Sequence, residues 1–191
     1  NASIKLVRVN LLSESTDHFD DLGFYLENDA KAELVQLELG GKRSYVGVRT
    51  ELVGRKSEYR SATGYLCKGD SLLDMNFVTN EWGKKVSSNM DASGVLLDNS
   101  TKVYRGTIDF KEGAKGASGF EKEDTLLFSP SIINKSVPLI LCHEEDVEGD
   151  HGATIGRIDE KLLFYIKSRG IDEKAAKQLM TEAYINAVTE Q

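Results

Sequence analysis

The chain has 191 residues, with 24 basic and 31 acidic side chains and a formal net charge of −7. This negative balance argues against a nucleic-acid-binding surface, which would need clustered positive charge, so we expect no nucleic acid as a partner. Hydrophobic residues make up 40% of the sequence and charged residues 29%, which argues against both a disordered chain and a membrane-spanning one.

The first residues and the cysteines indicate a cytoplasmic protein. No secretory signal is visible, and Cys67 and Cys142 are too few for a disulfide framework, as expected in a reducing compartment. The chain opens in a strand-like run at residues 3–9 without an initiating Met, so we expect an N-terminal segment to precede it.

Short strand-like runs make up most of the chain, and each ends in Gly, Asn, Asp or Ser, the usual turn residues. They recur about every 12 to 15 residues, which is typical of a sandwich, a barrel or a solenoid. The runs lie at residues 32–39, 43–53, 58–67, 72–79, 84–97, 101–110 and 125–128, with a further apolar run at 137–141.

Two features favour a solenoid. Small residues such as Ala62, Ala92 and Ala117 stand where successive coils would pack, and Asn or Asp recurs at turn positions such as 28–29 and 98–99. The repeat is degenerate, however, so periodicity alone leaves a β-helix and a β-sandwich equally supported.

The chain changes character after residue 157, so we divide it into a β domain at 1–157 and a helical segment at 158–191. Asp159 is expected to cap a first helix that ends at Gly170, and Asp172 to cap a second. Helical spacing predicts an apolar stripe that packs against the body or docks a partner. The stripe consists of Ala175, Ala176, Leu179, Met180, Ala183 and Ala187.

No phosphate-binding loop and no nucleophile elbow is present, and the densest polar cluster is residues 142–151. It holds Cys142, His143 and His151 among five carboxylates, an inventory that a transition metal accepts. The spacing matches no known metal motif. The alternative is structural: a buried cysteine, a solvated acidic loop, and His151 in a tight turn between two glycines.

A longer pattern surrounds this cluster. A Pro-led strand at 137–141 and an acidic turn precede HGA at 151–153, and LFY at 163–165 precedes SRG at 168–170. This order closely resembles the signature of the SufB/SufD family of iron–sulfur cluster assembly proteins. The HGA form resembles the SufD branch. The resemblance implies a right-handed parallel β-helix followed by a small C-terminal helical segment.

The resemblance also implies a function. Such proteins are non-catalytic scaffold or accessory subunits that pair with a SufB-like subunit or with a second copy. Their C-terminal helices dock SufC, an ABC-type ATPase, whose ATP-driven closure would strain the scaffold. The positions implied for docking are Phe164, Tyr165, Arg169, Gly170, Leu179, Met180 and Tyr184.

His151 aligns with the His of the family motif, which implies a place near the joint between paired subunits. One imidazole cannot hold a cluster, which takes about four ligands. Gly149 stands where some members have Cys, and Cys142 lies off that position. We therefore expect no tightly bound cofactor, but a transient iron–sulfur cluster shared with a partner through His151 and, less directly, Cys142.

Two other functions stay open. A homodimeric β-helix could serve as an interaction protein that binds no cluster. A β-helix could also be a carbohydrate-active enzyme, with Glu144, Glu145 and Asp146 binding calcium or acting on a sugar. Fold analogy alone gives this last alternative little support.

Overall fold

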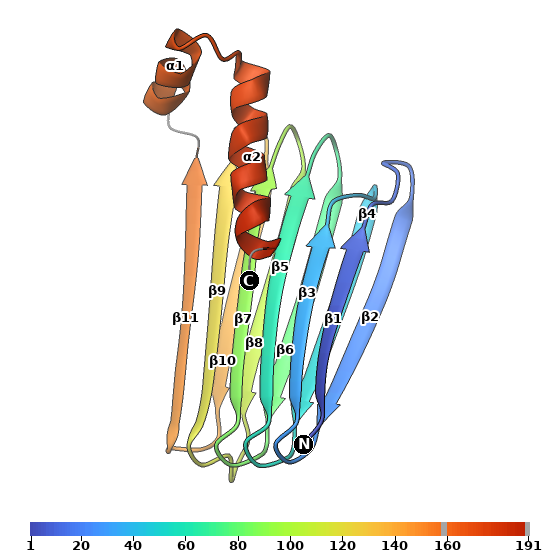
Figure 1. The fold of residues 1–191 in the computed structure, drawn as a ribbon, viewed down its shortest axis with the longest axis vertical. Coiled ribbons are helices and arrows are strands. Elements are labelled where there is room, and N and C mark those ends of the chain that lie inside the picture. Colours follow the sequence, from blue (N-terminus) through green and yellow to red (C-terminus); the bar gives the residue numbers. More distant parts are fainter. Residues whose placement is uncertain (158–159, 190–191) are drawn as a thin grey trace.

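The body of the protein is a parallel β-helix, seen side-on in Figure 1. The computed structural model describes residues 1–157 and 160–189. Successive strands alternate between two sheets, in the orders β1-β3-β5-β7-β9-β11 and β2-β4-β6-β8-β10. One strand from each sheet makes a coil, and the strand pairs of both sheets are parallel. The solenoid prediction is therefore confirmed, and the sandwich is excluded because neighbouring coils stack in parallel.

The strands are mostly 10 residues long. The first sheet contains β1 (Ser3–Asn10), β3 (Lys31–Glu38), β5 (Glu58–Cys67), β7 (Ser87–Leu96), β9 (Ala117–Leu127) and β11 (Val147–Arg157). The second contains β2 (Asp17–Leu26), β4 (Arg43–Leu52), β6 (Leu72–Glu81), β8 (Thr101–Phe110) and β10 (Ile133–Cys142).

Most predicted runs coincide with strands, including residues 3–9 in β1 and residues 137–141 in β10, but two strands of the end coils were missed. The runs at 58–67 and 101–110 coincide with β5 and β8, whereas β9 begins well before the predicted residue 125. β2 and β11 were missed, and His151 lies in β11 instead of a tight turn. These strands belong to the outermost coils, where little of the inward face is covered, so their sequences carry no strong apolar alternation.

Hydrogen bonds between successive turns hold the coils in register. The Asn28 side-chain oxygen accepts the backbone N–H of Arg55 at 2.7 Å, and the Asp98 carboxylate accepts that of Gly69 at 2.7 Å. Each bond joins one coil to the next. The recurring Asn and Asp predicted as turn residues therefore act between turns as well as within them.

The main core lies between the two sheets. Alternation along each strand points every second side chain inward, and the largest of these include Tyr65, Phe77, Tyr104 and Phe110. The Phe77 and Tyr104 rings meet edge-to-face with centroids 5.6 Å apart. Because burial of a large apolar side chain contributes about 2 kcal/mol, this shared interior is the main source of stability.

Glycines on the inward rows make room for large neighbours. A methyl group on Gly94 would lie 2.1 Å from the Tyr65 ring, and one on Gly106 would lie 1.9 Å from the Glu121 carboxylate. The Tyr65 ring cannot swing away freely because its hydroxyl bonds to Thr125 at 2.7 Å.

Two helices follow the β-helix: α1 (Glu160–Ser168) and α2 (Glu173–Thr189). α2 lies on the outer face of the first sheet, against β5 and β7 (Figure 1), and buries Ala176 completely. Of the predicted stripe, Ala176 packs against the sheet, whereas Leu179 and Ala183 are exposed, as the docking alternative would require. Ala175, Met180 and Tyr184 are partly buried.

The side chain of Ala187 and the predicted cap Asp159 lie outside the described part of the chain. No helix in the described ranges is both long and apolar enough to span a membrane.

We predict that Gly94→Ala lowers the free energy of unfolding by about 3 kcal/mol, because the added methyl group would overlap the fixed Tyr65 ring. Urea unfolding followed by circular dichroism measures this. Gly23→Ala is the matched control: it lies in β2 with no heavy atom within 4 Å of the added methyl group, so its effect should stay within about 0.5 kcal/mol. Equal effects of the two substitutions would contradict this account of the interior.

Candidate functional site

The last coil of the β-helix is open on one side. β10 and β11 each pair with one neighbour, β8 and β9, and stand at the ends of their sheets. Their outer edges therefore present backbone N–H and C=O groups without a strand partner in the described chain. Large apolar side chains are exposed on the same two strands: Ile133, Val137, Leu139, Leu141 and Ile155. The arrangement is one that a further pair of strands would complete.

His151 lies in the middle of β11, at this open coil. Its register partner on β9 is Glu121, which points inward and is buried. Residues paired in parallel register share a face, so His151 belongs to the inward row. It is nevertheless exposed, because no further coil covers it in the described part of the chain. The imidazole thus stands over the open end of the interior, directly above a buried carboxyl group.

The carboxyl group beneath His151 has a strongly altered acidity. Burial raises the pKa of Glu121 to about 7; the Tyr104 hydroxyl opposes the rise and the charge of Glu123 adds to it. A carboxyl group with such a pKa is half-protonated near neutral pH. The end of the interior is therefore able to exchange a proton in the physiological range.

A buried ion pair lies in the same part of the interior. The Lys102 ammonium group donates to Glu123, and both side chains are almost inaccessible to solvent. The Tyr65 hydroxyl donates to the same carboxylate at 3.1 Å. Burial lowers the pKa of Lys102, and the Glu123 charge opposes this. A buried pair of this kind is stable only while both partners remain.

The two cysteines lie in different environments. Cys67 is buried, and burial raises the pKa of its thiol to about 12, which makes it an unreactive core residue. Cys142 is exposed at the end of β10, in register with Phe110, whereas His151 is in the middle of β11. The described residues contain no group of three or more His, Cys, Asp or Glu side chains that could hold a metal ion.

In the acidic run after Cys142, the Glu144 carboxylate accepts hydrogen bonds from the backbone. The Glu144 carboxylate accepts the N–H groups of Gly113, Glu145 and Asp146, and the bond from Asp146 is the largest cause of its lowered pKa. The Nε2 atom of His143 lies 3.6 Å from Asp109, which also binds Lys111. These contacts favour the structural interpretation of the run over a calcium or sugar site.

α1 exposes an apolar surface. Phe164 is 75% exposed and Tyr165 54% exposed, with Leu162 beside them. Neither aromatic ring is therefore buried against the end of the β-helix. The Arg169 guanidinium stacks over the Tyr165 ring at 5.1 Å. A helix that leaves two aromatic rings in water is suited to binding a partner.

α2 connects this exposed helix to the sheet. Glu173 at its start pairs with Lys167 of α1 and with Lys177, one turn further along α2. The predicted docking positions on α2 differ in exposure. Leu179 points to solvent, whereas Met180 and Tyr184 are partly buried. Arg169 and Gly170 are exposed between the helices, and Gly170 has the positive φ of a helix stop.

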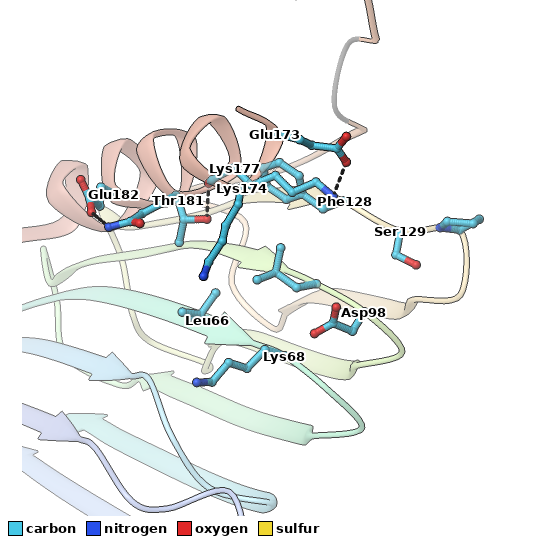
Figure 2. A pocket seen from close by; sticks show the side chains of 13 residues that line it. Leu66, Lys68, Asp98, Phe128, Ser129, Glu173, Lys174, Lys177, Thr181 and Glu182 are labelled. Carbon is cyan, nitrogen blue, oxygen red and sulfur yellow. Dashed lines mark hydrogen bonds and ion pairs between the residues drawn. The ribbon is translucent and has the colours of Figure 1, made fainter. Parts of the chain in front are cut away.

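A groove of about 1000 Å³ lies between α2 and the turns that follow β5, β7 and β9 (Figure 2). Figure 2 shows Leu66 and Asp98 on the β-helix side of the groove and Lys174 and Thr181 on α2. Sequence analysis missed this groove because its walls come from segments far apart in the chain, and none of them carries a motif.

The sequence matches the family described as SUF system FeS cluster assembly, SufBD core domain, over residues 1–184. Among curated proteins it is 25% identical to the iron–sulfur cluster assembly protein SufD of Escherichia coli K12, over 100% of the chain and 45% of that protein.

It is also 25% identical to SufD of Bacillus subtilis 168, over 78% of the chain and 40% of that protein. A chloroplastic protein of Arabidopsis thaliana, ABCI7, is 23% identical over 100% of the chain and 40% of its own length. The chain thus spans less than half the length of these relatives.

We predict that Glu121→Gln removes a pH dependence of stability. The folded pKa lies above the unfolded value of 4.5, so the folded state binds the proton more tightly and wild-type stability falls as pH rises from about 4.5 to 7. Between pH 5 and 8 the variant should gain roughly 3 kcal/mol relative to wild type, at about 1.4 kcal/mol per pKa unit. Urea unfolding across this range measures the difference, with the exposed Glu112→Gln as control. The prediction would be refuted if the free energy of unfolding changed with pH in the same way for wild type and Glu121→Gln.

Proposed function

The chain belongs to the SufBD core-domain family of the SUF system for iron–sulfur cluster assembly, and on this premise we propose that it is a non-catalytic scaffold subunit. In this proposal α1 and α2 dock a SufC-like ABC-type ATPase in the cytoplasm, and the open coil pairs with a SufB-like subunit or a second copy. The observation that carries the docking proposal is the exposed aromatic face of α1.

Docking on α1 is supported by its surface chemistry. Phe164 and Tyr165 lie in water, and each large apolar side chain that becomes buried contributes about 2 kcal/mol to association. Arg169, stacked on Tyr165, adds a cationic group of the type that anchors interfaces. The groove beside α2 offers Leu66 and Phe128 to a partner side chain.

The packing of α2 gives a route by which docking could act on the scaffold. The Glu173 ion pairs join α1 to α2, and α2 rests on β5 and β7. A nucleotide can bias the scaffold only if the ATPase states differ in how they bind it. A displacement of α1 by ATPase closure would be transmitted through α2 to the first sheet, whose last strand carries His151.

Pairing through the open coil is supported by the unmatched edges of β10 and β11. A partner that adds strands there would satisfy their backbone groups and bury Leu139 and Ile155. It would also place its own side chains over His151. We propose that the cluster is cargo assembled at this joint, with His151 as one ligand and the other ligands from the partner, and with Cys142 at the rim.

We predict that Tyr165→Ala combined with Arg169→Ala weakens ATPase binding on the order of 100-fold, because both anchors of the docking surface are lost. Calorimetric titration of the intact protein with the SufC ATPase of the same organism measures this.

The matched control for docking is Tyr25→Ala combined with Arg60→Ala, which removes an exposed tyrosine and an exposed arginine from the β-helix surface. It should bind as the wild type does. A folded Tyr165/Arg169 variant with unchanged affinity would refute docking on α1. Removal of the residues after 157 should abolish binding altogether.

We predict that Leu139→Lys and His151→Ala separate pairing from cluster formation. A lysine at the edge of β10 should prevent pairing and, with it, the visible absorbance gained on anaerobic reconstitution with iron and sulfide. His151→Ala should leave pairing intact and lose at least half of that absorbance.

Sedimentation velocity measures pairing in both variants, and Leu179→Lys on α2 is the control for an added surface charge. Full absorbance in His151→Ala would exclude the imidazole as a ligand. If the wild-type protein pairs but gains no absorbance on reconstitution, the result would favour the alternative of a homodimeric interaction protein that binds no cluster.

A further inference from the structure

Basic side chains gather on the turns that lead from the second sheet back to the first. These turns form the lower edge of the molecule in Figure 1, opposite α1 and α2. Three successive turns place five exposed basic residues side by side. This basic strip consists of Arg55, Lys56, Lys84, Lys85 and Lys115.

Backbone hydrogen bonds hold the strip in a regular array. The Lys56 N–H donates to the Lys84 carbonyl at 3.0 Å, and the Lys85 N–H donates to the Lys115 carbonyl at 2.9 Å. Coils joined in this way repeat about every 4.8 Å, the strand spacing. The positive charges are therefore set close together on a rigid support before any ligand arrives.

The basic residues of the strip lack the acidic partners that basic residues on the neighbouring sheet face have. On the outer face of the first sheet, Lys5 pairs with Glu33 at 2.6 Å and Lys31 with Glu58 at 2.8 Å, each across one coil. Within the described ranges, no residue of the strip forms an ion pair with a carboxylate, although the Lys115 charge helps to lower the pKa of Glu144. Stacked like charges repel one another, so the fold alone gives no reason for the strip.

The backbone at two of these lysines is also unfavourable. Lys56 and Lys85 have φ values of 59° and 57°, in the left-handed region that side chains with a Cβ rarely adopt. The two lysines occupy equivalent positions of successive turns; the equivalent residue is Gly116 in the next turn (φ 71°) and Asp29 in the preceding one (φ 55°). Lysine at these two positions costs stability, and an observed cost of this kind points to a function for the side chain.

The surroundings of the strip limit what it can bind. Asp29 lies on the turn before the strip, and Glu144, Glu145 and Asp146 lie on the turn after it, so the positive charge spans only three coils, about 10 Å between the outer two. The third of these turns also carries one exposed acidic residue, Glu112. This span is too short for a nucleic-acid backbone and suits a few carboxylates. Trp82 is 48% exposed, and its Nε1–H bonds to Glu51 at 2.7 Å. The Lys111 ammonium group lies over the ring, 5.1 Å from its centroid, so the remaining exposed part of the ring offers an apolar anchor beside the strip.

We propose that the basic strip binds an acidic segment of a partner protein, with two or more carboxylates along the axis of the solenoid and an apolar residue against Trp82. The site lies at the opposite edge from α1 and α2, so the partner binds without competing for the docking helices (Figure 1). This interaction does not depend on ATPase docking or on cluster assembly.

The test uses the intact protein and a fluorescein-labelled deca-glutamate peptide, measured by fluorescence anisotropy at low salt. Wild type should bind the peptide, and the variant Lys56→Gly, Lys84→Gln, Lys85→Gly should bind at least 10-fold more weakly. Because glycine relieves the left-handed backbone, this variant should be at least as stable as wild type in thermal unfolding. Loss of binding then cannot come from unfolding.

A control variant removes three positive charges elsewhere, Lys42→Gln, Arg60→Gln and Lys122→Gln, and should change affinity less than 2-fold. Equal weakening by both variants would show a general effect of net charge and overturn the proposal. Absence of peptide binding by wild type would also overturn it. So would tighter binding of a ten-residue oligothymidylate than of the peptide, because the strip would then be a nucleic-acid site.

Discussion

Parallel pairing of each strand with the strand one coil later is the constraint from which the other features follow. It places equivalent residues of successive coils in continuous rows, so that each side chain meets the same two neighbours above and below. The rows end where the chain leaves the solenoid, and the last residue of each row has a neighbour on one side alone. His151 is such a residue, with Glu121 beneath it and nothing above it in the described chain.

The same rows explain how a polar interior is tolerated. The Lys102–Glu123 pair is supported by the Tyr65 hydroxyl, and large side chains fit because Gly94 and Gly106 leave space beside them. Burial of charge between two sheets is costly unless such partners are present. Removal of one member would leave the others unsatisfied, so the interior resists slippage of one coil against the next.

A two-sheet solenoid also separates its surfaces. The open coil lies at the end of the axis, the helices lie over one edge, and the basic strip lies along the other edge. Each surface has its own chemistry: unmatched backbone groups, exposed aromatic rings, and stacked positive charge. The chain belongs to the core-domain family of the SUF system for iron–sulfur cluster assembly, and three separate surfaces would allow the partners proposed above to bind at the same time.

The sequence by itself determined the repeat, the turn residues and the helical segment, because turn chemistry and helical spacing are local properties. The order of the HGA segment with His151 and the LFY and SRG segments around α1 also made the family resemblance recognisable. The sequence did not reveal β2 or β11, whose strands lack alternation because end coils bury little. Only the tertiary structure decided that Leu179 faces solvent, that His151 stands above Glu121, and that five basic residues from three turns share one edge. Each of these depends on register between segments distant in the chain, which no local pattern contains.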